Sequence, residues 1–223
     1  MSFNLENSRL YRRLRYAKHG VIIFVGTGQW GKTVSMHALL NSPLFASRSK
    51  AMVNYPKKFV TDYLPPEYRA CRWPEDLQDF PKIFKPSRDC VVIDDAVFFA
   101  GARDHATKGN KDVQKMLTIA SHNELFFFLT IQSMGLLDFS LLQSQDVYIF
   151  HKNMDVLSMQ FERPEFRSKQ LIANLRLDNA RDEYPELEPK GFSYCSTTYE
   201  LIYNSLPSYW SPRLSKPFYG VVP

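Results

Sequence analysis

The feature that most constrains the fold of this chain is a short apolar run joined directly to a glycine-rich octapeptide. The run Gly20–Val25 reads GVIIFV and has no polar face. Such a run is typical of a strand that is buried on both sides in a parallel sheet. The octapeptide Gly26–Thr33 reads GTGQWGKT, and apolar residues at helical spacing follow it as far as Pro43. The sequence therefore predicts a strand, a tight turn and a helix in immediate succession.

The octapeptide matches the G-x-x-x-x-G-K-[ST] pattern of phosphate-binding loops. Its glycines allow a positive φ and a close backbone approach, so that successive N–H groups can point into one concavity. The start of the following helix adds partial positive charge for a phosphate. We expect Lys32 to reach the β- and γ-phosphates of ATP and the Thr33 hydroxyl to ligate Mg²⁺. The expected nucleotide contacts are Gly26, Thr27, Gly28, Gln29, Trp30, Gly31, Lys32 and Thr33.

One residue of this phosphate-binding loop is unusual. Trp30 precedes Gly31 at a position where small residues are common. Its ring is expected to point away from the phosphates, toward solvent, adenine or a neighbouring subunit. The alternative interpretation of the whole octapeptide is a glycine-rich turn that binds nothing, and the predicted strand and helix on either side of it argue against that alternative.

Two acids follow a second apolar run, Cys90–Ala96, which reads CVVIDDA. We expect a strand beside the strand that leads into the phosphate-binding loop, so that Asp94 holds Mg²⁺ directly or through water. Asp95 is then placed to orient or deprotonate the attacking water, although glutamate is the more usual residue there. A strand that merely ends in solvated acids is the alternative, and the phosphate-binding loop upstream favours the metal ligand.

A third apolar run, Leu125–Ile131, ends at the polar residue Gln132. Its length is that of a strand, and its end is expected at the sheet edge where Asp94 and the phosphates lie. A glutamine there can hydrogen-bond the γ-phosphate or the attacking water, so Gln132 joins Lys32 and Asp95 as a predicted catalytic residue. The alternative is a strand-end glutamine that bonds a loop.

The rest of the chain indicates an α/β fold with a mainly parallel central sheet flanked by helices. We expect one domain over residues 1–223, with a basic lead-in at 1–19, a nucleotide-binding core at 20–152 and a C-terminal β or irregular elaboration at 153–223. Further strands are predicted at Lys50–Tyr55 and Asp146–Lys152, and further helices at 112–124 and 163–176. The stretch 56–88 is predicted to be loops with a short helix near 75–79, 181–189 to be an acidic loop, and 191–203 to be an antiparallel strand or hairpin.

Composition excludes some classes of protein and favours others. The three cysteines, Cys71, Cys90 and Cys195, lack metal-site spacing and predict reduced thiols, with Cys90 buried in a strand. No apolar run approaches the roughly 20 residues that span a bilayer, so a soluble chain without a transmembrane segment is expected. The formal net charge of +5 has the sign expected of a protein that meets a polyanion, although a chain without a charged partner can also carry it.

Taken together, the phosphate-binding loop, the Asp94–Asp95 pair and the run that ends at Gln132 resemble the FtsK–HerA superfamily of P-loop ATPases. The resemblance covers about residues 20–152, and the genome-packaging ATPases of tailless icosahedral viruses with internal membranes are similar in size. It implies a RecA-like sheet, a ring-shaped homo-oligomer that is often a hexamer, and ATP-driven translocation of double-stranded DNA. It also implies a place in the host cytoplasm or at the virion vertex.

The resemblance has two departures. Asp95 stands where the family usually has glutamate, and Ser121-His122 stands where members often have Arg-His. An arginine that acts on the phosphates of a neighbouring subunit must then come from elsewhere, and Arg103, Arg163 and Arg167 are unranked candidates.

Basic and aromatic segments suggest partners. The basic residues between Arg9 and Lys18, with Lys108 and Lys111, are candidates for contacts with DNA phosphates, and a solvated face is the alternative. The aromatic tail at 203–223 is expected to pack across the domain or to dock on a partner such as a neighbouring subunit, a capsid vertex or a membrane-associated viral protein.

Two other functions remain open. An assembly or export ATPase of the filamentous-phage type shares the predicted sheet and the glutamine, but such proteins ordinarily carry a transmembrane helix. A nucleotide or small-molecule kinase also uses the G-x-x-x-x-G-K-[ST] pattern and needs an arginine-rich lid, for which residues 163–170 are the candidate.

Overall fold

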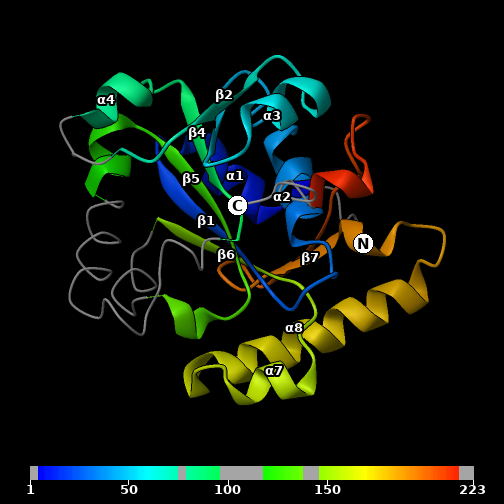
Figure 1. Cartoon of the computed structure of the whole chain (residues 1–223). Coiled ribbons are helices and arrows are strands. Elements are labelled where there is room, and N and C mark those ends of the chain that lie inside the picture. The colour runs from blue at the N-terminus through cyan, green and yellow to red at the C-terminus, as the bar shows by residue number, and fades with distance from the viewer. Residues whose placement is uncertain (1–4, 75–78, 96–117, 138–145, 216–223) are drawn as a thin grey trace.

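A computed structural model describes residues 5–74, 79–95, 118–137 and 146–215. Their strands form one sheet in the order β3-β2-β4-β5-β1-β6-β7-β8, with parallel pairing from β3 to β6 and antiparallel pairing at β7 and β8 (Figure 1). The predicted α/β class with a mainly parallel sheet is confirmed. The strands are β1 (Gly20–Val25), β2 (Ser49–Val53), β3 (Tyr68–Cys71), β4 (Asp89–Ile93), β5 (Phe126–Ile131), β6 (Val147–His151), β7 (Phe192–Cys195) and β8 (Glu200–Tyr203).

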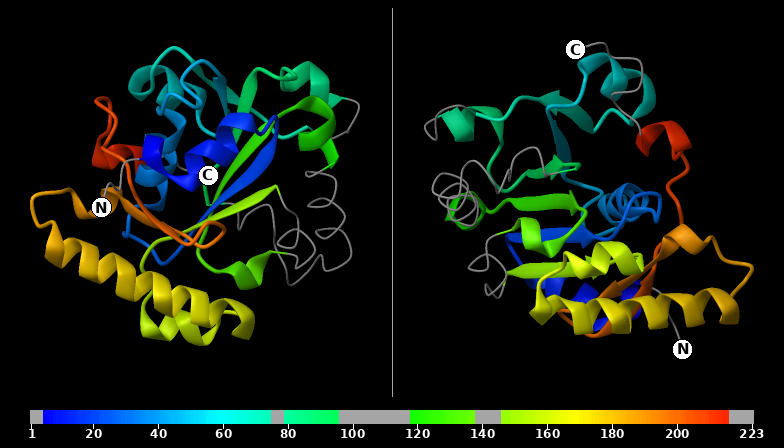
Figure 2. Two further views of the ribbon diagram at one scale, coloured as in Figure 1. Left: turned by 180° about the vertical axis from the view of Figure 1, so that it is seen from behind. Right: turned by 60° about the horizontal axis from the view of Figure 1, so that its bottom comes forward.

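Helices cover both faces of this sheet (Figures 1 and 2). The helices α1, α2 and α3 pack on one face, whereas α4, the helical residues 118–123 and the start of α8 pack on the other. The labelled α-helices are α1 (Arg9–Tyr16), α2 (Lys32–Leu40), α3 (Lys57–Tyr63), α4 (Phe80–Ile83), α7 (Val156–Gln160) and α8 (Pro164–Glu183). Short 3-10 turns lie at η1 (Leu5–Asn7), η4 (Met134–Leu136), η5 (Pro189–Gly191) and η6 (Pro212–Ser215).

The apolar runs are buried because alternate side chains feed two separate cores. In β1, Ile22 and Phe24 face the core beneath α2, whereas Val21 and Ile23 face the opposite core. Every residue of β1 and β5 is buried. Fully burying one such side chain contributes about 1.5–3 kcal/mol, so these strands anchor the centre of the fold.

The order of the central strands differs from the sequence prediction. The strand that leads to Asp94, β4, was expected beside β1, but β5 lies between them and pairs with both. The register aligns Val25 with Ile131 and Leu129 with Ile93. Because the three strands are parallel, the residues that follow them meet at one edge of the sheet. The insertion of β5 therefore places Gln132 between the phosphate-binding loop and Asp94.

Two segments hold more regular structure than the sequence predicted. The lead-in holds α1, whose N-terminal N–H groups at Arg9 and Leu10 donate to the Glu200 carboxylate at 2.8 and 3.0 Å. The stretch 56–88 holds α3, β3 and α4 rather than loops alone. These elements are too short for a clear periodicity, so their contacts with the sheet decide their structure. Residues 75–78 of the expected short helix, and 112–117 of the expected helix 112–124, lie outside the described residues.

The C-terminal region is more helical than predicted. Helix α8 extends from Pro164 to Glu183, beyond the predicted end at 176 and into the predicted acidic loop. A further short helix, α7, lies beside it, and both lie below the sheet in Figure 1 and in the left view of Figure 2. The predicted hairpin is confirmed as β7 and β8, which pair antiparallel. The described part of the tail packs on the domain, where the rings of Tyr209 and Trp210 lie against His37 of α2.

Candidate nucleotide-binding site

The phosphate-binding loop begins with a glycine that no other residue can replace without a clash. Gly26 has a φ of +150°, and an added Cβ would lie 2.9 Å from the Asn153 carbonyl oxygen and from Lys152 Cβ. The N–H of Thr27 donates to the same Asn153 oxygen at 3.2 Å. The loop is therefore fixed to the segment that follows β6.

The loop ends with a second such glycine. Gly31 has a φ of +86° and forms the N-cap of α2, and an added Cβ would lie 2.9 Å from Lys190 Cβ. Gln29 also has a positive φ, of 69°. These left-handed residues turn the chain sharply from β1 into α2, so the N–H groups at the start of α2 face the carboxyl edge of the sheet, as an anion site requires.

Lys32, the first residue of α2, folds over the loop. Its amine donates to the carbonyl oxygens of Gly26 and Thr27 at 2.8 and 3.0 Å. Burial lowers the pKa of Lys32, while the nearby carboxylates of Asp95 and Asp94 act in the opposite direction. The two acids thus help to keep the amine cationic at the position where phosphates are expected.

Asp94 and Thr33 meet at the carboxyl edge of the sheet. The Thr33 hydroxyl donates to both oxygens of Asp94 at 3.2 Å. Two residues that the sequence analysis did not select hold the same carboxylate: Tyr55 donates to Oδ2 at 2.8 Å and Thr130 to Oδ1 at 2.5 Å. Burial raises the pKa of Asp94, and the three hydroxyl donors lower it.

Asp95 lies in the turn after β4 and is exposed. Its φ of 52° is left-handed, and its N–H donates to the Thr130 hydroxyl oxygen at 2.7 Å. The Thr130 hydroxyl therefore donates to the Asp94 carboxylate and accepts from the backbone N–H of Asp95. The two acidic side chains point in different directions. The partly buried Asp94 faces Thr33, whereas the Asp95 side chain reaches solvent beside the loop.

Gln132 is exposed where β5 ends, between the strands that lead to the loop and to Asp94. The segment after it is tied to the C-terminal region: the N–H of Met134 donates to the Glu162 carboxylate at 2.8 Å, and Arg163 donates to the Leu137 carbonyl oxygen at 2.5 Å. The chain that follows Gln132 is therefore bonded to the junction of α7 and α8.

Trp30 packs against α8 rather than lying free. The Arg181 guanidinium lies 4.9 Å from the centre of the indole ring and donates to Asn153 Oδ1 at 2.6 Å. Because the Asn153 carbonyl oxygen accepts from Thr27, the loop and α8 share one polar support. The ring remains partly exposed, at 41%.

Two of the three candidate arginines, Arg163 and Arg167, lie within the described residues. Arg163 is bonded to the Leu137 carbonyl oxygen, and Arg167 donates to the Glu162 and Gln160 carbonyl oxygens at 2.9 and 2.7 Å. The Arg163 guanidinium thus ties the start of α8 to the segment after β5, and the Arg167 guanidinium supports the chain between α7 and α8. Arg103, like Lys108 and Lys111, lies outside the described residues.

The donor set fits ATP with Mg²⁺. Mg²⁺ prefers oxygen ligands and usually takes one or two from protein and the rest from phosphate and water, and Thr33 and Asp94 supply a hydroxyl and a carboxylate side by side. Over the described ranges, no group of three or more His, Cys, Asp or Glu side chains could hold a metal.

The sequence analysis missed Tyr55, Thr130 and Lys152. One signal was available, because Thr130 is the polar exception in the apolar run Leu125–Ile131. Tyr55 and Lys152 end their predicted strands, and nothing in the local pattern assigns either to the site. Their placement follows from strand order, which brings the ends of separate strands together.

The mainly parallel sheet, which brings the phosphate-binding loop, Gln132 and the Asp94–Asp95 pair to one edge, has the fold of solved viral genome-packaging ATPases. The structure is similar to the DNA-packaging ATPase B204 of Sulfolobus turreted icosahedral virus, with a TM-score of 0.50 and 11% identity over 84% of this chain and 98% of that one. It is equally similar to the genome-packaging NTPase B204 of Sulfolobus turreted icosahedral virus 2 in complex with ATPγS, with a TM-score of 0.50 and 11% identity over 85% and 99% of the two chains. No protein-family model matches the sequence, and no curated protein matches it significantly. Within the described residues, no helix has the length and apolar character needed to cross a membrane.

Proposed function

We propose that this chain hydrolyses ATP and uses the energy to translocate double-stranded DNA during viral genome packaging. The observation that carries the proposal is the convergence of Lys32, the Thr33–Asp94 pair and Gln132 on one edge of the sheet. The chain also shares its fold with genome-packaging ATPases over 98% and 99% of their length, which supports the proposal.

Each polar residue at this edge has a chemical task in the proposal. Lys32 neutralises the β- and γ-phosphates, and Thr33 and Asp94 would hold Mg²⁺, which would supply further positive charge beside the phosphates. Asp95 reaches solvent beside the loop and accepts the proton of the attacking water. Gln132 hydrogen-bonds the γ-phosphate or that water. Through this bond it signals the presence of the γ-phosphate to the following segment, which is bonded to Glu162.

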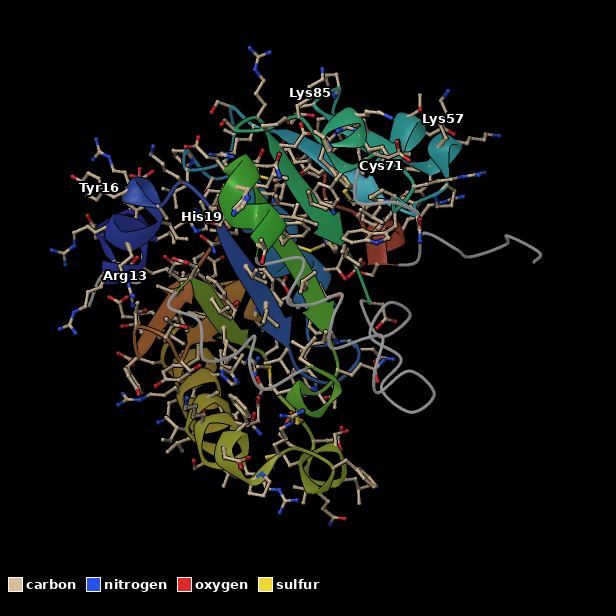
Figure 3. The ribbon with its side chains drawn as sticks, turned by 90° about the vertical axis from the view of Figure 1, so that its left-hand side faces the viewer. Arg13, Tyr16, His19, Lys57, Cys71 and Lys85 are labelled. Atoms are coloured by element: carbon tan, nitrogen blue, oxygen red, sulfur yellow. The ribbon has the colours of Figure 1, made fainter. Side chains whose placement is uncertain are left out.

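The DNA partner is proposed from charge and position. The guanidinium groups of Arg9, Arg12, Arg13 and Arg15 on α1 are exposed. Arg13 lies with Tyr16 and His19 on one side of the molecule, away from Lys57 and Cys71 (Figure 3). A cationic face of this kind attracts phosphate backbones without reading sequence. Assembly into a ring, often a hexamer in the family that the sequence resembles, would repeat this face around DNA, in the host cytoplasm or at a virion vertex.

The deciding experiment is the ATPase rate of the purified protein with and without double-stranded DNA of several sequences. A motor is expected to be stimulated by duplex DNA whatever its sequence. Phosphorylation of a nucleotide or other small acceptor, with no response to DNA, would identify a kinase instead. ATPase activity that DNA does not stimulate, with no transfer of phosphate to a small acceptor, would favour an assembly or export ATPase and would refute the DNA motor.

A further inference from the structure

Lys152 is a fully buried lysine directly beneath the phosphate-binding loop. Its N–H donates to the Val25 carbonyl oxygen at 2.7 Å, and its Cβ is the atom that a side chain at Gly26 would meet at 2.9 Å. The side chain extends to the first turn of α2, where its amine donates to the Ser35 hydroxyl at 2.9 Å. Lys152 thus contacts the start of the loop and the first part of the helix that follows it.

The hydrogen-bond network around the amine requires its charged form. Besides Ser35, the amine donates to the carbonyl oxygens of Lys190, at 2.8 Å, and Phe192. Ser35 donates its own proton to the Lys190 oxygen at 3.2 Å and accepts from Ser193 at 3.0 Å. All three partners of the amine are therefore acceptors, and only an ammonium group has three protons to donate.

Among the residues that the structure describes, this ammonium has no acidic partner in contact. No carboxylate of the described residues forms an ion pair with Lys152. Burial lowers the pKa of Lys152 well below its usual range, the nearby cations Arg181 and Lys32 act in the same direction, and Glu188 opposes them. A buried cation in such surroundings is unfavourable unless an anion compensates it.

A second buried lysine shows how this chain compensates such a charge elsewhere. Lys50 of β2 is also fully buried, and its amine donates to the Ala46 carbonyl oxygen at 3.1 Å. It lies 5.7 Å from the centre of the Tyr68 ring, so an aromatic face offsets its charge. Among the described residues, the structure gives no aromatic ring of this kind to Lys152.

We infer that Lys152 is a second cationic residue of the phosphate site and that the polyphosphate of the nucleotide is its counter-ion. The inference rests on the proposed binding of ATP. Lys152 acts through the loop rather than by contact, because Gly26 and the first turn of α2 lie between its amine and the face that binds phosphate. It is a positioning residue whose charge adds to that of Lys32 and of the helix terminus.

The test compares binding of ATP, ADP and AMP by calorimetry in EDTA, without DNA. Lys152→Met keeps the length of the side chain and removes its charge, whereas Lys152→Gln keeps a hydrogen-bond donor. Both are expected to weaken binding in the order of ligand charge, with a factor about tenfold larger for ATP than for AMP. A merely structural role would weaken all three nucleotides by one common factor.

Lys50→Met is the matched control, because it removes a buried ammonium remote from the loop, and it is expected to change all three affinities by less than about twofold. Equal losses for ATP and AMP in the Lys152 variants, or no loss, would overturn the inference. Failure of both Lys152 variants to fold would assign the ammonium to the core and overturn it as well. Absence of ATP binding by the unmodified protein would refute the proposed function itself.

Discussion

Thr33 and Asp94, 61 positions apart in the chain, are joined by hydrogen bonds of 3.2 Å from the hydroxyl to both carboxylate oxygens. Thr33 is the second residue of α2 and Asp94 directly follows β4, so the contact exists only when the parallel strands are assembled. The pair supplies two oxygen ligands at the mouth of the phosphate-binding loop, and it defines where Mg²⁺ would lie in the proposed ATPase.

Asp94→Asn should remove the magnesium dependence of ATP binding. The amide keeps the shape of the side chain but loses the charge that attracts a divalent cation, so the gain in ATP affinity from Mg²⁺ should fall on the order of tenfold or more. The measurement is the ATP dissociation constant with Mg²⁺ and with EDTA. Asp79→Asn, which alters an exposed acid paired with Lys82, is the control. Unchanged magnesium dependence in the Asp94 variant would rule out its role as a ligand.

Lys32→Ala should abolish hydrolysis, with a rate loss of at least about a hundredfold, because the amine is the cation expected at the β- and γ-phosphates. The measurement is steady-state release of phosphate. Lys85→Ala is the matched control, since Lys85 is exposed and precedes β4 at the opposite edge of the sheet. Turnover at the unmodified rate in the Lys32 variant would show that the octapeptide is not a catalytic phosphate site.

Thr130→Val should slow hydrolysis about tenfold or more, while ATP affinity in EDTA stays within about twofold. Valine has the same shape but lacks the hydroxyl that donates to Asp94 and accepts from the Asp95 N–H. The readouts are the rate of hydrolysis and the binding constant. Thr61→Val, which removes an exposed α3 hydroxyl bonded to the Lys57 carbonyl oxygen, should change neither. Normal hydrolysis by the Thr130 variant would mean that the acids keep their positions without it.

Gln132→Ala should separate a DNA motor from a general nucleotide hydrolase. The side chain is exposed between the loop and Asp94 and contributes little to the core, so ATP affinity should stay near that of the unmodified protein. Most stimulation of the ATPase by duplex DNA should disappear, because the residue would no longer report the γ-phosphate to the segment bonded to Glu162.

The control is Gln160→Ala, which removes an exposed glutamine at the end of α7. The measurement is the ratio of the ATPase rates with and without DNA for each variant. Undiminished stimulation in the Gln132 variant would leave the glutamine as an ordinary strand-end residue, and it would remove a main reason for preferring a motor.

Stability should fall on mild acidification because of buried histidine. Burial lowers the pKa of His37 to about 4, whereas a histidine in the unfolded chain titrates near 6.5. The folded pKa is depressed, so the full contribution is present above pH 6.5 and is lost as the pH falls toward 4. The loss between pH 7 and 5 should be about 2 kcal/mol for this residue. Buried His151, whose pKa is also lowered to about 4, should add a similar amount.

Urea unfolding at pH 7 and pH 5 measures this loss. His37→Phe should reduce the difference between the two free energies of unfolding by the share of His37, because phenylalanine can occupy the aromatic cluster with Tyr68 and Tyr209 without titrating. An identical pH dependence in the variant would show that His37 is protonated, or accessible, in the folded chain.

The sequence by itself determined the local parts of the site. The run Gly20–Val25 and the octapeptide after it predict strand, turn and helix, because glycine conformations and apolar periodicity are properties of neighbouring residues. The same holds for the acids that end one run and for Gln132 at the end of another. The parallel α/β class follows from the alternation of such runs with helical segments, and the structure confirms it.

Only the tertiary structure decided which of these parts touch. The sequence could not predict the position of β5 between β1 and β4, the hydroxyls of Tyr55 and Thr130 on Asp94, or buried Lys152 behind Gly26. Each depends on pairing between strands far apart in the chain. The free energy of such pairing comes from many contacts across the sheet, and no local pattern of residues records it.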